Sequence, residues 1–127
     1  MKRFSDHSTL ATRALQCYLI LIGCAPRRET ITYSMLGEKL GYTSPNHAAG
    51  VMGGHIGPIM FWCQQNNLPP LTSLVVRDDT GLPGEGLTAS QDFPADQQKA
   101  FKFDWFAIFP PSVKELEEAV RIGRVAA

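Results

Sequence analysis

Two helix signals separated by a short turn constrain the fold of this chain more than any other feature. Thr32 is a residue type that caps helix N-termini, and Ile31 and Leu36 have the spacing of a hydrophobic staple across such a cap. Gly41 suits the left-handed position that commonly ends a helix. A second helix signal begins only a few residues later. The stretch therefore predicts a helix, a turn and another helix.

The second helix has its own start and stop signals. Ser44 is the predicted N-cap, Pro45 suits the first helical position, and apolar residues continue the helix to Met52. Glycines and a proline follow, and they predict a break or kink and a fresh helical start near Pro58. That last segment is expected to extend to about Asn67. The interrupting residues are Gly53, Gly54, Gly57 and Pro58.

The remaining elements are predicted from apolar spacing and from turn residues. Apolar residues at helical spacing predict a buried helix over 8–23 with Ser8 as its cap, and the apolar run 71–77 predicts a strand. Ser112 and Glu115 form an S-x-x-E capping box that predicts the last helix. The other segments are a turn over 78–81, an irregular exposed stretch over 88–96, and residues 97–105, which fit a helix or a strand.

Length and composition favour one globular domain over residues 1–127. The apolar fraction is 44% and the charged fraction 19%, which suits a packed core and argues against general disorder. The predicted fold class is α/β in the α+β sense: a helix-turn-helix or winged-helix-like half, a small sheet and a C-terminal helix. An ordinary helical bundle that uses the same turn is an equally weighted alternative.

Charge is balanced overall but unevenly distributed. The 12 basic and 12 acidic residues give a net charge of zero, which counts against a non-specific nucleic-acid binder. The N-terminal part is basic, including Arg27, Arg28 and Lys39, and the part after residue 77 is acidic. A binding face on the basic half is the sharper interpretation of this asymmetry, and a solubilising surface is the plainer one, which we favour.

The leading hypothesis is a non-enzymatic winged-helix-like module that contacts double-stranded DNA. In such a module the second helix offers its N-terminal residues to the major groove, which here would be Asn46 and His47, with Thr43 and Ser44 near phosphates. The flanking positive charge would come from Arg27, Arg28 and Lys39. One feature opposes this hypothesis: no Arg or Lys lies between residues 41 and 77, whereas phosphate contacts supply much of DNA affinity.

The stretch from residue 31 to residue 86 resembles the C-terminal domain of the DNA alkyltransferases and alkyltransferase-like proteins. The residues ITYSMLGEKLGY match that family's TYG-x-(I/L)-A-x-x-LG helix, HAAGV loosely matches its AARAVG recognition helix, and VVR with the following loop matches the end of its PCHRVV strand. The resemblance implies a DNA-binding domain, and it adds Tyr33 of the first motif to the predicted DNA contacts.

The chain lacks the residues with which that family transfers alkyl groups and displaces a base. The acceptor cysteine and its histidine fall at residues 71–74, which hold neither, and Gly50 stands where the family inserts an arginine into the base stack. The resemblance therefore implies no alkyl transfer.

No cofactor, metal site or catalytic group is predicted. Three scattered cysteines indicate a reducing compartment, no cluster of Cys and His has metal-ligand spacing, and no apolar run is long enough to span a bilayer. A cytoplasmic location is therefore expected. The glycine-rich residues 81–86 lack the lysine of a phosphate-binding loop and are interpreted as a hairpin tip.

Two other functions remain open on sequence grounds. A protein-interaction module, such as a small accessory, antitoxin or inhibitor protein, fits the zero net charge and the acidic C-terminal half. A small enzyme that uses Asp78 and Glu85 is the third interpretation, although no spacing demands it. The aromatic group after residue 100, next to Lys99 and Lys102, is expected to pack in the core, and an exposed part of it would suit a protein partner.

Overall fold

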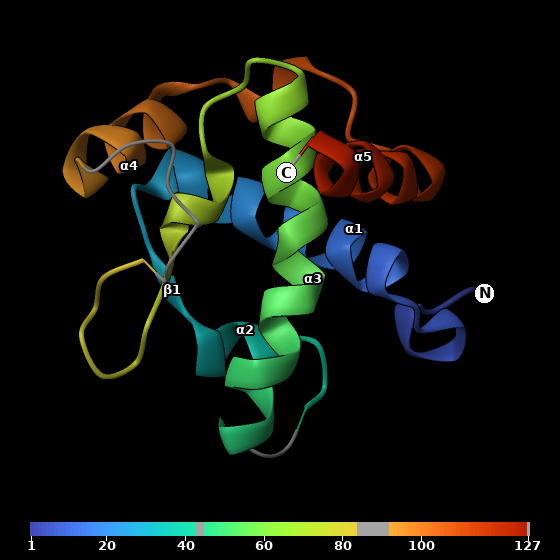
Figure 1. The fold of residues 1–127 in the computed structure, drawn as a ribbon. Helices are drawn as coiled ribbons and strands as arrows, with labels where there is room; N and C mark the ends of the chain where they lie inside the picture. Colours follow the sequence, from blue (N-terminus) through green and yellow to red (C-terminus); the bar gives the residue numbers. More distant parts are fainter. Residues whose placement is uncertain (43–44, 84–91, 127) are drawn as a thin grey trace.

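The fold is mostly helical with one small sheet, which places it in the α+β class (Figure 1). The computed structural model describes residues 1–42, 45–83 and 92–126. In these ranges the α-helices are α1 (Leu10–Cys24), α2 (Tyr33–Lys39), α3 (Pro45–Gln65), α4 (Phe93–Lys102) and α5 (Val113–Ala126). Short 3₁₀ turns are η1 (Phe4–His7), η2 (Ala25–Arg27), η3 (Leu71–Leu74) and η4 (Trp105–Ala107), and the strands are β1 (Ile31–Thr32) and β2 (Val75–Val76).

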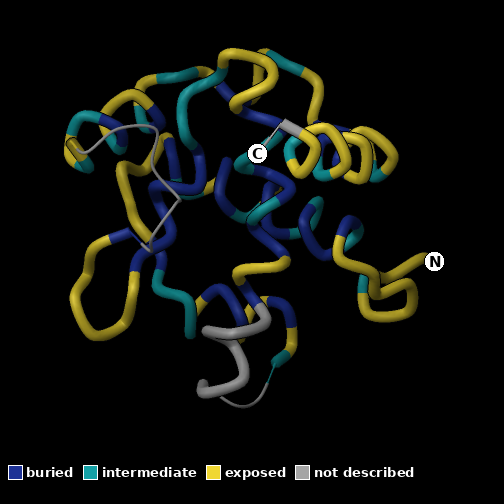
Figure 2. The backbone as a smooth tube through the Cα atoms, viewed as in Figure 1, coloured by how far each residue is buried: buried dark blue, intermediate teal, exposed yellow. Residues whose placement is uncertain are grey.

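The core lies where α3 packs against α1 and α5 (Figure 2). Buried residues of η3 and η4 extend it, and η3 also contacts α4. Tyr18 of α1 is fully buried and meets Trp62 and Trp105 edge-on, with ring centroids 5.6 and 6.3 Å apart. The indole N–H of Trp105 donates to the carbonyl of Ala100 at 2.8 Å, so this large side chain is buried with its polar atom satisfied. The expected packing of the aromatic group against the first helix therefore holds for Trp105.

Local capping explains where α1 begins. Thr9 is the N-cap, and its hydroxyl accepts a hydrogen bond from the Thr12 N–H while the Thr12 hydroxyl accepts one from the Thr9 N–H. The prediction of Ser8 as the cap is wrong by one residue. The Ser8 hydroxyl instead accepts a hydrogen bond from Nε of Arg13.

The signals for α2 are confirmed. The Thr32 hydroxyl accepts a hydrogen bond from the Met35 N–H at 3.1 Å, and Ile31 and Leu36 are both buried beside this cap. Gly41 adopts φ 92°, a conformation that glycine reaches at little cost, and it reverses the chain after the helix.

The predicted break in the next helix is wrong, because α3 runs without interruption through Pro58. Proline cannot donate the N–H bond to the carbonyl four residues back, which normally destabilises a helix interior. Here the helix is held by its buried side, since Met52, Ile56 and Ile59 are fully buried on either side of Gly57 and in the turn that contains Pro58. Tertiary packing outweighs the local helix-breaking residues.

The predicted strand over 71–77 is largely wrong. Its first half is the buried η3 turn, and only Val75–Val76 is extended, parallel to β1 with Ile31 opposite Val75. The turn after it is confirmed: the Arg77 N–H donates to the Leu82 carbonyl at 2.8 Å, and Val76 bridges Pro83 in an antiparallel sense. The rest of the 81–86 stretch lies outside the described residues.

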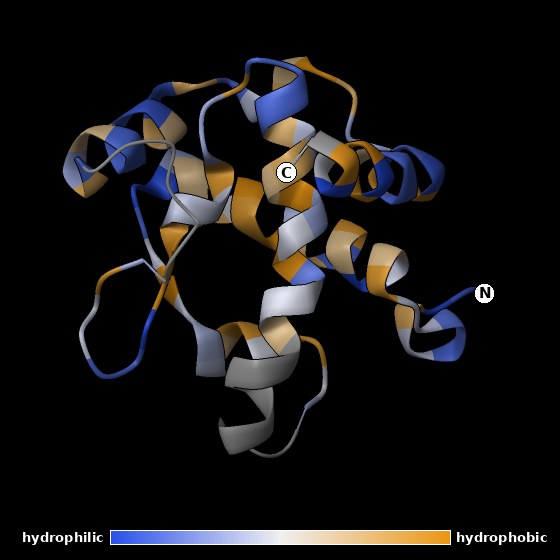
Figure 3. Cartoon of the chain, in the orientation of Figure 1, coloured by the Kyte–Doolittle hydropathy of each residue, from blue (hydrophilic) through white to orange (hydrophobic). Residues whose placement is uncertain are grey.

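Residues 97–102 are helical, although the sequence pattern fitted either a helix or a strand over 97–105. Residues 93–96, predicted to be irregular and exposed, begin α4, and Asp96 is buried there. The capping box of α5 is confirmed, because Ser112 and Glu115 exchange hydrogen bonds between side chain and backbone at 3.0 and 3.3 Å. Figure 3 shows hydrophobic and hydrophilic residues on different sides of α5, and the buried side contains Leu116 and Ala119.

Two helical glycines offer a matched test of this packing. A Cβ at Gly123 of α5 would lie 2.3 Å from the Phe61 ring, whereas a Cβ at Gly53 of α3 would meet nothing within 4 Å. We expect Gly123→Ala to lower the free energy of unfolding by about 1–3 kcal/mol through overpacking. Gly53→Ala should raise it by about 1 kcal/mol through helix propensity. Urea denaturation of both variants checks this, and equal effects at the two sites would contradict the described α3–α5 contact.

Candidate nucleic-acid interface

The corner between α2 and α3 is held by a buried arginine from α1. Only 6% of Arg13 is exposed, and its guanidinium donates to the Leu40 carbonyl at the end of α2 at 2.9 Å. It also donates to Ser8 and Gln16, each at 2.9 Å. A cation at a helix C-terminus interacts favourably with the helix dipole, so Arg13 stabilises the end of α2 by charge as well as by hydrogen bonding.

Tyr42 and His55 complete the corner. The Arg13 guanidinium lies 5.4 Å from the centre of the Tyr42 ring, which is a cation–π contact. The Tyr42 hydroxyl and Nε2 of His55 share a hydrogen bond of 2.6 Å, and the two rings stack with centroids 5.8 Å apart. Because Tyr42 follows α2 and His55 lies in α3, these contacts fix the two helices relative to each other.

The surroundings of His55 disfavour its protonated form. Burial lowers the pKa of its imidazole, and the nearby positive charge of Arg13 lowers the pKa further. Among the described residues, Nδ1 of this ring is buried with no hydrogen-bond partner. Protonation would place a second buried cation beside Arg13. The folded state should therefore be more stable at neutral or alkaline pH than at acidic pH.

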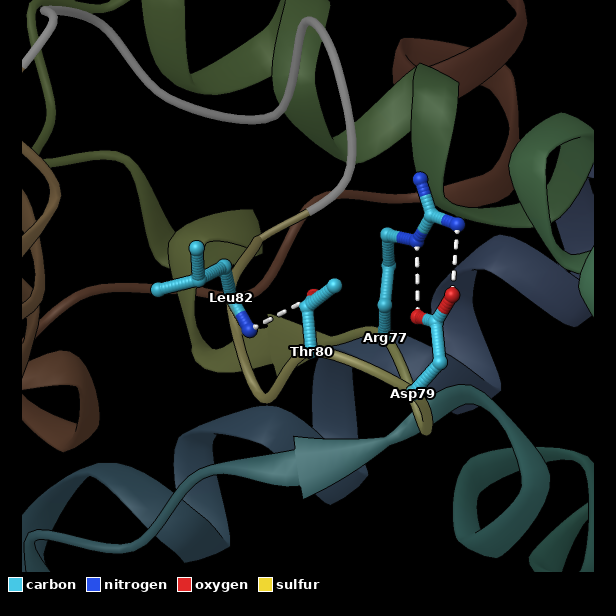
Figure 4. A network of polar contacts seen from close by, with 4 residues as sticks. All are labelled: Arg77, Asp79, Thr80 and Leu82. Atoms are coloured by element: carbon cyan, nitrogen blue, oxygen red, sulfur yellow. Dashed lines mark hydrogen bonds and ion pairs between the residues drawn. The ribbon is translucent and has the colours of Figure 1, made fainter.

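The turn over residues 77–83 lies beside the start of α2. Asp78 accepts a hydrogen bond from the Ser34 N–H at 3.3 Å, which ties the turn to the first turn of α2. Arg77 forms a bidentate pair with Asp79 at 3.0 and 2.9 Å, and the Leu82 N–H donates to the Thr80 hydroxyl (Figure 4). The hydrogen bond from Arg77 holds the pKa of the Asp79 carboxyl below its usual value.

The predicted DNA-contacting residues do not form one cluster. Arg27 lies 3.8 Å from Glu29 in an exposed ion pair, and Arg28 donates to Gln98 of α4 at 3.1 Å, on the side of the molecule where η2 meets α4. Lys39 is exposed in the last turn of α2.

The other predicted contacts are near the corner. Tyr33 is the first residue of α2 and is half-buried, and burial raises the pKa of its hydroxyl. Asn46 and His47 lie in the first turn of α3, which contains no acidic residue. Their side chains, like residues Thr43 and Ser44 as a whole, lie outside what the structure describes.

Sequence reasoning missed the role of Arg13 and of Tyr42. An arginine in a helix is usually solvent-exposed, and only its place between apolar Ala11 and Ala14 could have signalled burial.

The thiols are poor candidates for nucleophilic chemistry. Burial raises the pKa of both Cys17 and Cys63 to about 12, so these thiols stay protonated at neutral pH. Burial also raises the pKa of the half-buried Cys24. Within residues 1–42, 45–83 and 92–126, no three His, Cys, Asp or Glu side chains gather as metal ligands would.

Comparisons of the chain with protein-family models, with curated protein sequences and with solved structures find no match. Among the described residues, no helix combines the length and the apolar character needed to cross a membrane.

The corner makes stability depend on pH. The folded-state pKa of His55 lies below the unfolded value of 6.5, so the unfolded chain binds more protons between the two values. We therefore expect the free energy of unfolding to fall as pH drops below about 6.5. Urea unfolding at pH 7.5, 6.5 and 5.5 measures this fall.

The variant His55→Gln should have a smaller fall over that range. His7→Gln is the matched control, because His7 is exposed in η1, and it should keep the full dependence. Equal pH dependence in both variants would exclude His55 as its source.

Proposed function

We propose that this chain is a DNA-binding module of helix-turn-helix type, with α3 as the helix presented to the major groove. The observation that carries the proposal is the α2–α3 corner, in which a short helix and a long one are locked across a brief turn by Arg13, Tyr42 and His55. Figure 1 shows α2 and the first turns of α3 together at one end of the molecule. A recognition helix needs such a fixed support.

The start of α3 suits contact with a phosphate backbone. It begins with Pro45 and has no acidic residue in its first turn, so no carboxylate of that turn offsets the positive end of the helix dipole. Asn46 and His47 would face the base edges of the major groove, and Thr43 and Ser44 would lie near the phosphate backbone. The turn over residues 77–83, beside α2, would serve as the wing.

The exposed cations of the N-terminal half would supply phosphate contacts. Lys39 ends α2, and the described partners of Arg27 and Arg28 are the exposed Glu29 and Gln98, which hold these side chains weakly. The order of helix, turn, helix and strand also follows the order of the motifs that resemble the alkyltransferase C-terminal domain, and this relationship is part of the proposal.

Fluorescence anisotropy with labelled duplex DNA at two salt concentrations tests the proposal. We expect saturable binding that weakens as salt rises, because counterions are released from the phosphates. Lys39→Glu should weaken binding and lower the salt slope by about one, as expected for one lost phosphate contact. Asn46→Ala should reduce the preference between duplex sequences. Lys114→Glu makes the same charge change on α5 and should bind like the parent. A flat titration at low salt, or equal loss with Lys114→Glu, would overturn the proposal.

A protein-interaction module is the second candidate, and exposed aromatic side chains favour it. Phe106 is 66% exposed and Phe109 is 93% exposed, in and after η4. Aromatic side chains are frequent anchors at protein interfaces.

The variant Phe106→Ser with Phe109→Ser should lose a partner that the parent chain co-purifies from its own cells. Leu19→Ser, which alters an exposed apolar residue of α1, should retain that partner. Retention by all variants would remove this candidate.

A further inference from the structure

A groove of about 380 Å³ lies between α1, α3 and α5 and is not part of the α2–α3 corner. Its apolar lining includes Leu10 of α1, Phe61 of α3 and Val120 of α5. Leu10 is 53% exposed, and Phe61 and Val120 are half-buried. A surface that covered the groove would remove this apolar area from water, which favours association.

The part of the groove that α3 contributes contains bare helix backbone. A Cβ at Gly53 or at Gly57 would meet no atom within 4 Å, so the packing of the fold does not require glycine at either position. Glycine is nevertheless less favourable than alanine in a helix interior. A second molecule can approach the backbone at these two positions more closely than it could approach a helix with side chains there.

Two charged residues of α5, Glu117 and Arg124, also line the groove, and both are exposed. They are seven residues apart, so they lie on the same face of the helix about 10 Å from each other. Among the described residues, neither side chain has a hydrogen-bond or ion-pair partner. One face of α5 therefore presents a negative and a positive charge that are both unpaired.

This pair of charges is complementary to itself under two-fold symmetry. In a symmetric dimer, a residue that contacts a second residue of the other copy is matched by the reciprocal contact. If two α5 helices lie antiparallel with the axis near Val120, Glu117 of each copy lies opposite Arg124 of the other. Arg121 is also near that axis, but it already pairs with Glu118 of its own helix. The two-fold arrangement therefore pairs both free charges of each copy.

The overall charge of the chain also permits association of identical copies. The 12 basic and 12 acidic residues give a net charge of zero. Proteins with a large net charge repel copies of themselves, and this chain has no such repulsion.

We propose that a second copy of this chain covers the groove, in a two-fold symmetric dimer whose α5 helices run antiparallel. Glu117 of each copy pairs with Arg124 of the other, and the apolar lining of the two grooves is buried between the copies. The dimer surface is separate from the proposed DNA-binding surface, and its test requires no DNA.

Sedimentation equilibrium of the full chain over a series of concentrations tests for the dimer. We expect the average mass to rise with concentration from the 14.0 kDa of one chain towards twice that value. A mass of one chain at every concentration up to about 1 mM, the range of weak association, would overturn the proposal.

Charge-swap variants test which surface forms the dimer. Glu117→Arg places like charges opposite each other at both contacts, so it should raise the dissociation constant of the dimer about tenfold or more. Arg124→Glu should do the same for the opposite sign. A mixture of these two variants restores opposite charges in the mixed dimer, which should form with about the affinity of the parent.

The matched control is Glu29→Arg, which makes the same charge change at an exposed residue outside the groove lining. It should form dimers like the parent, and circular dichroism checks that each variant keeps its helices. Equal dissociation constants for the parent and Glu117→Arg would overturn the proposal, as would a mixture of folded variants that does not associate. If Glu117→Arg does not fold, Arg124→Glu decides by the same comparison with the parent.

Discussion

The packing of α3 from Met52 to Cys63 is the constraint on which the other features depend. The helix has a proline in its interior and glycines one turn before it, so its local sequence opposes a continuous helix. Burial of Met52, Ile56, Ile59 and Trp62 against α1 and α5 holds it together. One continuous helix thereby connects the α2–α3 corner at its start with the aromatic core near its end.

The corner shows how a buried charge is accommodated with no carboxylate among the described hydrogen-bond partners of Arg13. Arg13 donates to a helix-terminal carbonyl and to two polar side chains, and it lies over the Tyr42 ring. A buried cation with such partners is costly to disturb, because removal of one partner leaves an unpaired charge or acceptor. This cost gives α2 and α3 a fixed geometry, which any surface made from the two helices would share.

The proposed DNA-binding surface uses the N-terminus of α3, and Gly53 and Gly57 lie farther along the same helix. The glycines are inefficient for helix stability and are not required by internal packing. Such a departure from local preference is where a function is expected in an otherwise consistent fold.

The sequence by itself determined the features that depend on contacts between residues a few positions apart. The Thr32 cap, the Gly41 reversal and the Ser112–Glu115 box each form within one helical turn, so their signals could be read directly. The cap of α1 was misplaced by one residue, because neighbouring Ser8 and Thr9 are both good caps and only the pairing with Thr12 selects between them.

Only the tertiary structure decided the features that depend on distant partners. The continuity of α3, the shortness of β2 and the burial of Arg13 follow from packing between segments far apart in the chain. The local pattern signals the burial of Arg13 only weakly, through its apolar neighbours, and gives no signal for the other two features. The groove between α1, α3 and α5 is likewise formed by three helices. In the sequence, its glycines Gly53, Gly54 and Gly57 indicated only a helix break. Long-range burial outweighs local propensity here because it removes large apolar side chains from water, whereas each propensity is worth about 1 kcal/mol or less for residues other than proline.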